Sequence, residues 1–337
     1  MRTFSLKIFC KNHIILENID QFFKEITLGR EPKNLYEPIY YTLTQGGKRL
    51  RPRLVVMAAQ LFGGDEKTAL YPAAAFEMLH NFSLIHDDIM DDAPIRRGKP
   101  TVYRKWNGNT AILSGDALAT LALETMLNTP TDPETRLKLS RLLAQTSVEI
   151  CEGQQEDLDF ESMENVTIEN YIHMIRYKTA VMLAGCLKAG AILCGTSEEN
   201  QNAIYEYGIN IGLAFQLKDD LLDVYGDKTV FGKKIGGDIR ENKKTYLFLR
   251  TWQDACPEEQ TVLKHYYFSS TQTFNDEEKF NAVKAIYDAN DIQEKTAAHI
   301  NELVAKALEE LDKIQIPDDS KKQNFKDLAF ELSRRDK

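Results

Sequence analysis

The chain has 337 residues, of which 43% are hydrophobic and 28% are charged. This composition is typical of a folded protein with a large core and excludes an intrinsically disordered chain. The formal net charge of -9 argues against nucleic acid as the main partner, because duplex binding needs a dense basic surface. Local basic pockets for small anions are compatible with this charge.

The five cysteines are scattered and show neither the spacing of a zinc knuckle nor that of a redox motif. The N-terminal residues hold no apolar run of signal-peptide length and no small-residue cleavage site, and we find no apolar stretch of about 18 residues. We therefore predict reduced cysteines, a cytoplasmic location, and a chain that is neither exported nor membrane-spanning.

Apolar residues recur at helical spacing along the chain, whereas alternating β-branched runs bounded by turn residues are scarce. The sequence therefore predicts an almost entirely helical protein. No compositional shift and no long linker divides it, so we expect one large helical bundle, a single domain over residues 1–337. Gly, Pro, Asp and Asn cluster at the expected breaks, which are residues 28–33, 62–66, 128–133, 196–199, 226–238, 254–258 and 316–320.

Two of the expected helices, residues 73–90 and 202–224, are apolar on all faces and belong in the bundle interior. The first runs into the acidic sequence LIHDDIMDD, and the second ends in QLKDDLLDV. Spacing of four residues puts side chains on one helical face. The pairs with this spacing are Asp87 with Asp91, Asp88 with Asp92, and Asp219 with Asp223, and Asp220 lies beside the last pair.

These acidic clusters need a positive partner. Unpaired carboxylates beside an apolar core are costly, and like charges one turn apart repel each other. Basic side chains or a metal ion could neutralise them, although a solvated acidic face is the plainer interpretation of one such cluster alone. Because oxygen ligands favour hard cations and few acids per cluster leave room for phosphate oxygens, Mg²⁺ fits better than Zn²⁺. The pattern therefore predicts a magnesium-bridged phosphorylated substrate.

Basic residues beside glycines supply the rest of an anion site. GGKRLRP occupies residues 46–52, RRG at residues 96–98 follows the first acidic motif, and lysine pairs at 233–234 and 243–244 follow the second. Arg binds phosphate through a bidentate fork and Lys as a point charge. Any one of these groups is typical of an exposed surface, but their repetition beside acids and glycines favours anion binding. The sequence has neither a GxxxxGK[ST] loop nor a strand-linked GxGxxG, so a nucleotide site is unsupported.

These motifs, in this order, resemble those of the trans-isoprenyl diphosphate synthases, the head-to-tail prenyltransferase family that includes farnesyl and geranylgeranyl diphosphate synthases. The resemblance covers most of the chain and implies an all-α bundle whose two aspartate motifs face each other across a deep central cavity. The matching motifs are GGKRLRP at 46–52, DDIMD at 87–91, RRG at 96–98, YKT at 177–179 and QLKDDLLD at 216–223, followed by GKKIGGD and NKKT.

The resemblance also implies roles for single residues. Asp87 and Asp91 would ligate two Mg²⁺ ions and Asp219 a third, with Mn²⁺ as a substitute, and Asp88, Asp220 and Asp223 would be supporting acids. The allylic diphosphate would be held by Arg96, Lys178, Lys233 and Lys243. The diphosphate of isopentenyl diphosphate would be held by Lys48, Arg51, His80 and Arg97, and Thr179 and Gln216 would lie near the reacting carbons.

The implied reaction explains this inventory. Cleavage of the allylic carbon–oxygen bond leaves diphosphate and a carbocation, and the carbocation alkylates the isopentenyl double bond. Divalent ions and fixed cations stabilise the developing negative charge, so no side-chain nucleophile is needed. Two alternatives stay open. A class I terpene cyclase would lack GGKRLRP and carry an altered second motif, and a non-catalytic subunit of a heteromeric synthase would carry degraded motifs; this chain shows neither departure.

Further expectations concern product, assembly and closure. By resemblance, residues four and five before the first aspartate, Ser83 and Phe82, help to form the cavity floor. An aromatic residue at the fifth position alone accompanies short products, so we expect twenty carbons rather than fifteen. Ser83 shares the helical face of Asp87, whereas Phe82 must reach sideways to the pocket. A homodimer is expected through the apolar segment 110–127, and the basic tail 333–337 is either a closing segment or a solvated end.

Overall fold

The structure is a computed structural model that describes residues 13–27, 29–226, 235–268 and 274–333. It is almost entirely helical, as predicted, and its chain divides into two compact units. Whether they act as the single domain expected over residues 1–337 stays a prediction. Unit 1 comprises residues 1–148, 182–205 and 314–322, and unit 2 comprises residues 149–181, 206–313 and 323–337.

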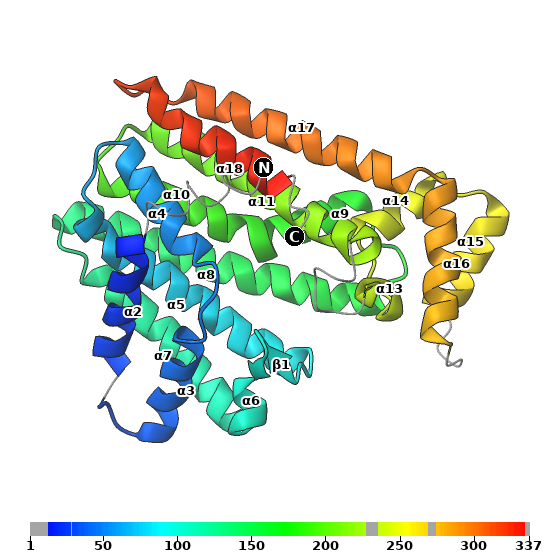
Figure 1. The fold of residues 1–337 in the computed structure, drawn as a ribbon, viewed down its shortest axis with the longest axis horizontal. Coiled ribbons are helices and arrows are strands. Elements are labelled where there is room, and N and C mark those ends of the chain that lie inside the picture. The colour runs from blue at the N-terminus through cyan, green and yellow to red at the C-terminus, as the bar shows by residue number, and fades with distance from the viewer. Residues whose placement is uncertain (1–12, 28, 227–234, 269–273, 334–337) are drawn as a thin grey trace. The chain divides into compact units, whose positions relative to one another are not determined.

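In unit 1 the helix α5 packs against both α4 and α7 (Figure 1). Most of the side chains of α5 between Ala69 and Leu79 are buried, in agreement with the predicted interior helix. Among them the three consecutive alanines 73–75 keep α5 thin enough for close packing. The helices and strands of this unit are α2 (His13–Thr27), α3 (Lys33–Leu43), α4 (Leu50–Leu61), α5 (Glu66–Met90), β1 (Ile95–Arg96), β2 (Lys99–Pro100), α6 (Val102–Lys105), α7 (Gly108–Leu127), the first half of α8 (Pro133–Ser162), most of α10 (Val181–Leu193), the start of α11 (Glu198–Tyr225) and η2 (Asp319–Lys322).

Helix α7 corrects the expectation that the chain has no apolar stretch of about 18 residues. By length and composition alone it could span a membrane, with a mean hydropathy of 1.2. In the structure α7 packs against α5 and α3, and this face buries Leu118, Leu121 and Met126. Its apolar composition therefore reflects its place as a core helix of unit 1.

The segment after the first acidic motif is not helical. Strands β1 and β2 pair as a two-stranded antiparallel hairpin in which Arg96 lies opposite Lys99. The turn residues Arg97 and Gly98 have φ values of 53° and 74°. Positive φ at both central residues is typical of the hairpin turns whose twist matches the flanking strands. The RRG motif is therefore a tight hairpin turn.

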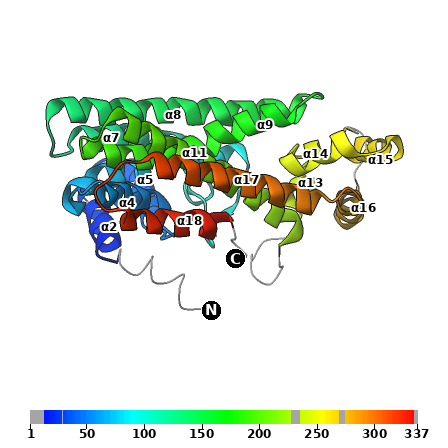
Figure 2. The ribbon, with the colours of Figure 1, turned by 90° about the horizontal axis from the view of Figure 1, so that it is seen from above.

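Unit 2 contains a π-helical turn, η1 (Arg176–Ala180), between α9 and α10. Helix α9 begins with a capping box in which the Thr167 hydroxyl accepts the N–H of Asn170, while the Asn170 side chain accepts the N–H of Thr167. Helices α17 and α18 lie side by side (Figure 2). The remaining helices of unit 2 are the second half of α8, α9 (Ile168–Ile175), most of α11, α13 (Gly237–Arg240), α14 (Tyr246–Asp254), α15 (Pro257–Tyr267), α16 (Asp276–Ala289), α17 (Ile292–Lys313) and α18 (Gln323–Ser333).

Six of the seven predicted breaks lie between helices, and the seventh, 226–238, falls partly outside the described residues. Within the described residues, the sequence missed the breaks at 44–49, 91–101, 106–107, 163–167, 241–245 and 290–291. The first two contain the basic motifs GGKR and RRG, and the break at 241–245 contains Lys243, so three of the missed connections carry candidate site residues.

Candidate functional site

The first acidic motif lies at the end of α5, in unit 1. The N–H of Asp91 donates to the carbonyl of Asp87 at 2.8 Å, so these residues are one helical turn apart as predicted. Asp91 is exposed and Asp87 is partly exposed. The predicted pairing of Asp88 with Asp92 is wrong, because the helix ends at Met90 and Asp92 has a φ of 48°. The Asp92 carboxylate instead accepts hydrogen bonds from the side chains of α6.

The second aspartate of this motif, Asp88, forms an ion pair with the β-hairpin. Asp88 is 4% exposed, and its carboxylate accepts a hydrogen bond from Nε of Arg96 at 2.7 Å. Burial raises the pKa of Asp88, and the charge of Arg96 opposes this rise. The structure therefore pairs two residues for which the resemblance implied separate tasks, a supporting acid and an allylic phosphate ligand.

The hairpin turn also reaches the glycine pair of GGKRLRP. Nη1 of Arg97 donates to the carbonyl of Gly46, and a Cβ on Gly47 would lie 3.0 Å from Cζ of Arg97. Gly47 has a φ of 129°, a conformation that favours glycine. The structure thus brings together the turn that carries Arg97 and the segment that carries Lys48.

His80 lies among the arginines of these motifs. Burial lowers its pKa well below 6.5, and the positive charges of Arg51, Arg97, Arg96 and Arg49 lower it further. His80 is therefore a neutral imidazole at pH 7. Burial likewise lowers the pKa of Arg51 and of Arg97, while the carboxylate of Glu77 raises both. Three of the four predicted isopentenyl diphosphate ligands, Arg51, His80 and Arg97, thus belong to one electrostatic cluster.

Sequence reasoning missed the ion pair beneath this cluster. Arg49 adopts φ 49° just before α4 and donates from Nη1 to Glu77 at 2.8 Å and from Nη2 to Asp20 at 2.9 Å. Arg49 and Glu77 are both almost fully buried. A glutamate inside the apolar run AAAFEMLH was the available signal, because a buried acid requires a partner.

The second acidic motif lies near the end of α11, in unit 2. Asp220 is 4% exposed, and its carboxylate accepts hydrogen bonds from the hydroxyl of Tyr171 and from Nε2 of Gln216. Burial and the nearby charge of Asp238 raise the pKa of Asp220 to about 8. Thr179 in turn donates to Oε1 of Gln216 at 3.1 Å. Three predicted residues, Thr179, Gln216 and Asp220, thus form one chain of hydrogen bonds, and Tyr171 is an addition.

The last aspartate of this motif anchors the following segment. The two oxygens of Asp223 accept the N–H groups of Gly237 and Asp238 at 3.2 and 3.1 Å, at the start of α13. Burial raises the pKa of Asp238 to about 6. Although burial opposes it, the charges of Asp238 and Glu241 raise the pKa of Lys243. The predicted ligand Lys233 lies outside the described residues, as do residues 334–337 of the basic tail.

The other predicted lysine of unit 2 already has an acidic partner. Nζ of Lys178 forms an ion pair with Asp157 of α8, and both side chains are 30% exposed. Lys244, beside Lys243, has a structural contact instead, because its Nζ donates to the carbonyls of Phe160 and Glu161 at the end of α8. A positive charge at the carboxyl end of a helix interacts favourably with the negative end of the helix dipole.

The two predicted product-length residues face different ways. Ser83 donates from its hydroxyl to the carbonyl of His80 at 2.9 Å, within α5. Phe82 instead stacks edge-to-face with His86, with ring centroids 4.8 Å apart. The His86 ring lies within hydrogen-bond distance of the carbonyl of Ile112 on α7. Phe82 therefore shares a helical face with His86, as its spacing predicts, and not with Asp87.

The donor chemistry of both motifs fits a hard divalent cation. Asp87, Asp91 and Asp219 are carboxylates with partly or fully exposed side chains, and Asp88, Asp220 and Asp223 carry the hydrogen bonds described above. Among the described residues no group of three His, Cys, Asp or Glu side chains converges as a metal site. Magnesium tolerates few protein ligands, because it usually keeps waters and substrate oxygens in its coordination shell. These residues therefore fit Mg²⁺ that is held jointly with a phosphorylated substrate.

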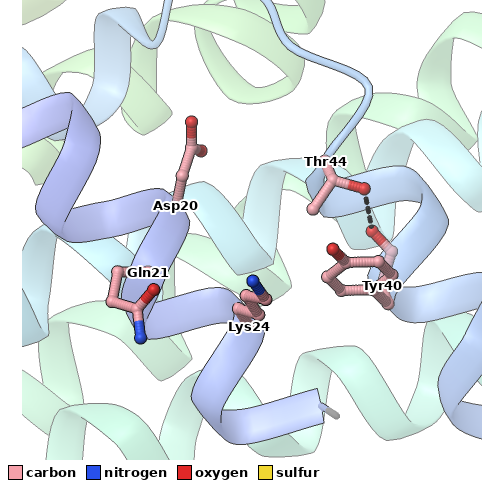
Figure 3. Close-up of a pocket in the computed structure, with 5 residues that line it drawn as sticks. All are labelled: Asp20, Gln21, Lys24, Tyr40 and Thr44. Atoms are coloured by element: carbon pink, nitrogen blue, oxygen red, sulfur yellow. Dashed lines mark hydrogen bonds between the residues drawn. The ribbon is translucent and has the colours of Figure 1, made fainter.

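A polar recess lies between α2 and α3, with a volume of about 350 Å³ (Figure 3). The Thr44 hydroxyl donates to the carbonyl of Tyr40 at 2.7 Å on its wall. The lining residues are Asp20, Gln21, Lys24, Tyr40 and Thr44. Asp20 links this recess to Arg49, and none of the predicted site residues that the structure describes lines it.

Comparisons with known proteins agree on the family. The polyprenyl synthetase model matches residues 32–288. A geranylgeranyl diphosphate synthase of Methanosarcina mazei is 41% identical over 236 residues, which cover 70% of this chain and 73% of that protein. A geranylfarnesyl diphosphate synthase of Natronomonas pharaonis is 37% identical over 335 residues, which cover 95% of each chain.

Solved structures extend the likeness over almost the whole chain. Geranylgeranyl pyrophosphate synthetase from Pyrococcus horikoshii is 34% identical with a TM-score of 0.90, and the match covers 98% of this chain and 99% of that one. Geranylgeranyl pyrophosphate synthase from Corynebacterium glutamicum, complexed with isoprenyl diphosphate and magnesium, is 28% identical with a TM-score of 0.82, over 96% and 98% of the two chains. The chain therefore belongs to the polyprenyl synthetase family, has the all-α isoprenoid synthase fold, and is a prenyltransferase of the short-chain trans-prenyl diphosphate synthase type.

Proposed function

We propose that this prenyltransferase condenses isopentenyl diphosphate with an allylic diphosphate, uses Mg²⁺, and releases geranylgeranyl diphosphate as its main product. The observation that carries the substrate class is the cluster of Arg49, Arg51, Arg96 and Arg97 around a neutral His80. Arg49 is buried, Arg51 and Arg96 are partly exposed, and Arg97 is exposed. Four positive charges around one side chain are stabilised by an anion with several oxygens, and a diphosphate supplies these. An intact cluster argues against a terpene cyclase, which has no isopentenyl diphosphate to bind.

In this proposal the predicted site residues divide into groups with separate tasks. Lys48, Arg51, His80 and Arg97 bind isopentenyl diphosphate through its diphosphate. Lys178, Lys233, Lys243 and Arg96 bind the allylic diphosphate, whose negative charge grows as the carbon–oxygen bond breaks. The hydrogen-bonded pair Thr179 and Gln216 lies where the allylic carbons react. Mg²⁺, with Asp87, Asp91 and Asp219 as ligands and Mn²⁺ as a substitute, neutralises the departing diphosphate as a Lewis acid.

The proposed product has twenty carbons because of Phe82. Its aromatic ring is five residues before Asp87, and Ser83 at the fourth position is small. The ring pair with His86 holds Phe82 on the side of α5 that faces α7. An elongating chain that descends between α5 and α7 would meet this ring. The names of the relatives support twenty carbons and also admit twenty-five, the geranylfarnesyl product of the Natronomonas protein.

We also propose a homodimer through α7 and the adjoining part of α8. While one face of α7 is buried in unit 1, its other side exposes apolar side chains, and α8 exposes two more. Isolated exposed apolar residues are ordinary, but a contiguous apolar strip favours an interface. The exposed residues are Ile112, Leu113, Leu123 and Leu127 of α7 and Leu137 and Val148 of α8. Light scattering that gave a 38.5 kDa particle at micromolar concentration would contradict the dimer.

One experiment tests the reaction and the product together. The purified protein is incubated with Mg²⁺, isopentenyl diphosphate and, in separate reactions, dimethylallyl, geranyl or farnesyl diphosphate, and the chain lengths of the products are measured. We expect diphosphates that end at twenty carbons. Cyclised hydrocarbons would indicate a terpene cyclase, and no turnover with any primer would indicate a non-catalytic subunit.

A further inference from the structure

The π-helical turn η1 is the least regular part of the helical run that begins at Ile168. The N–H after the turn, that of Val181, donates to the carbonyl of Arg176, five residues earlier. A π turn is rare and persists only where surrounding structure holds it, often at functional sites. This turn carries the YKT motif, Tyr177, Lys178 and Thr179. The contacts that hold the turn therefore also fix the positions of two candidate site residues, Lys178 and Thr179.

Two helical glycines allow neighbouring helices to touch the backbone of this turn. A Cβ on Gly153 of α8 would lie 2.8 Å from the carbonyl carbon of Tyr177 and closer still to the amide nitrogen of Lys178. A Cβ on Gly212 of α11 would lie 2.6 Å from Cα of Ala180. The obstacles are main-chain atoms and the Cβ of Ala180, which is fixed to the main chain, and none of them can rotate away as a flexible side chain can. Any residue larger than glycine must therefore displace η1.

Backbone conformation does not explain these glycines. Neither Gly153 nor Gly212 is among the glycines with positive φ. A glycine inside a helix costs about 1 kcal/mol relative to alanine. The compensating gain is the close approach to η1, at one position on each of two helices.

Each glycine is followed one helical turn later by a side chain that binds η1. On α8, Asp157 is four residues after Gly153 and forms the ion pair with Lys178. On α11, Gln216 is four residues after Gly212 and accepts the hydrogen bond of Thr179 at 3.1 Å. Residues four apart lie on one helical face. On one face, each helix thus presents a glycine that allows close contact with η1 and a side chain that binds η1.

We propose that Gly153 and Gly212 are positioning residues for prenyl transfer. They allow η1 to pack so closely that Lys178 forms its ion pair with Asp157 and Thr179 donates its hydrogen bond to Gln216. This inference rests on the proposed function, in which Lys178 and Thr179 act on the allylic substrate. Misplacement of a reacting group by about 1 Å can cost a hundredfold in rate. A single methyl group at either glycine displaces η1 by a comparable amount.

The test compares four alanine variants. Gly153→Ala and Gly212→Ala should lower kcat at least tenfold and raise the KM for the allylic diphosphate, with the KM for isopentenyl diphosphate within twofold of the wild type. Gly64, which follows α4, provides the packing control. In Gly64→Ala the new Cβ would collide with the side chain of Cys194, which lies outside η1. Gly108→Ala is the neutral control, because its Cβ meets open space. Both controls should keep kcat and both KM values within twofold of the wild type.

Two further measurements keep the inference falsifiable. Asp157→Asn removes the charge that pairs with Lys178 without adding a heavy atom. It should lower kcat and raise the allylic KM even if the alanine variants fail to fold. Without substrate, amide hydrogen exchange at residues 178–180 should accelerate in Gly153→Ala and Gly212→Ala but not in Gly64→Ala. Wild-type kinetics in Asp157→Asn, or equal kinetic effects of Gly153→Ala and Gly64→Ala, would overturn the inference. If the wild type itself formed no product, the proposed function would fail, and the exchange rates alone would still decide whether the glycines position η1.

Discussion

Replacing Glu77 by glutamine should strongly destabilise unit 1. Glu77 is 2% exposed and pairs with Arg49, which is 6% exposed, so the substitution leaves a guanidinium without its buried counter-charge. Removing one partner of a buried pair typically costs about 3–5 kcal/mol. Arg49 keeps Asp20 and the carbonyl of Leu43 as acceptors, which places the expected loss near the lower end, about 3 kcal/mol. At about 2 °C per kcal/mol for a chain of this size, Tm should fall by roughly 6 °C.

Asp20→Asn is the matched control, because it removes the other acid from the same arginine. The Asp20 side chain is 58% exposed, and an exposed ion pair contributes about 0–1 kcal/mol. Both variants are compared by circular dichroism melting in chloride buffer, without phosphate or substrate. Equal shifts for the two variants, or a change of less than about 1 °C in Glu77→Gln, would refute the reasoning about burial.

The same variant has a second expected effect. Glu77 also raises the pKa of Arg51 and Arg97, so its negative charge partly neutralises the cluster proposed to bind isopentenyl diphosphate. Without Glu77 an anionic ligand gains more from binding there. Isopentenyl diphosphate should therefore raise the Tm of Glu77→Gln by more degrees than that of the wild type, since a ligand stabilises the native state according to its affinity.

Three other outcomes are expected. Asp87→Ala, Asp219→Ala and excess chelator should each lower turnover by orders of magnitude, measured with radiolabelled isopentenyl diphosphate, and full activity in any of them would exclude the proposed metal ligands. Phe82→Ala should lengthen the product with little loss of first-step turnover, and an unchanged product distribution would show that other residues form the floor. The pKa of His80 in the native state lies well below 6.5. As pH falls through 6.5, His80 therefore binds a proton in the unfolded chain but not in the native state, and the free energy of unfolding decreases toward acid pH. In urea titrations at pH 6.5 and 5.5, His80→Gln should reduce this decrease by about 1 kcal/mol, and parallel behaviour of the two proteins would contradict a neutral imidazole at His80.

Local spacing was enough to predict the parts of the site that depend on one helix. The four-residue interval between Asp87 and Asp91 needs only helical geometry, and the apolar flanks of α11 were enough to place its acids in a buried helix. The error at Asp92 came from the helix end, where the chain turns through a positive φ toward the side chains of α6. Helix ends depend on turn chemistry and tertiary contacts, which a periodic pattern does not contain.

Contacts between residues far apart in sequence were beyond that reasoning. The partner of Arg49 is 28 residues away and the hydroxyl that binds Asp220 is 49 residues away, on Tyr171. The role of Gly153 likewise depends on a turn from another part of the chain. In each case the residue type was the only signal in the sequence. A buried acid and a buried tyrosine each need a polar partner, and a glycine inside a long helix is unfavourable unless it allows a close contact.

The paired aspartates of the two motifs divide their tasks in the same way. In each pair the second residue, Asp88 or Asp220, is 4% exposed and held by protein donors, which are Arg96 in unit 1 and Tyr171 with Gln216 in unit 2. The first residue, Asp87 or Asp219, lies about 100° further round its helix and is partly exposed. A buried anchor fixes the rotation of the helix end, and this rotation decides where the neighbouring carboxylate points. In the proposed function, the buried acid of each pair anchors the helix end, and its partly exposed neighbour reaches the metal ion.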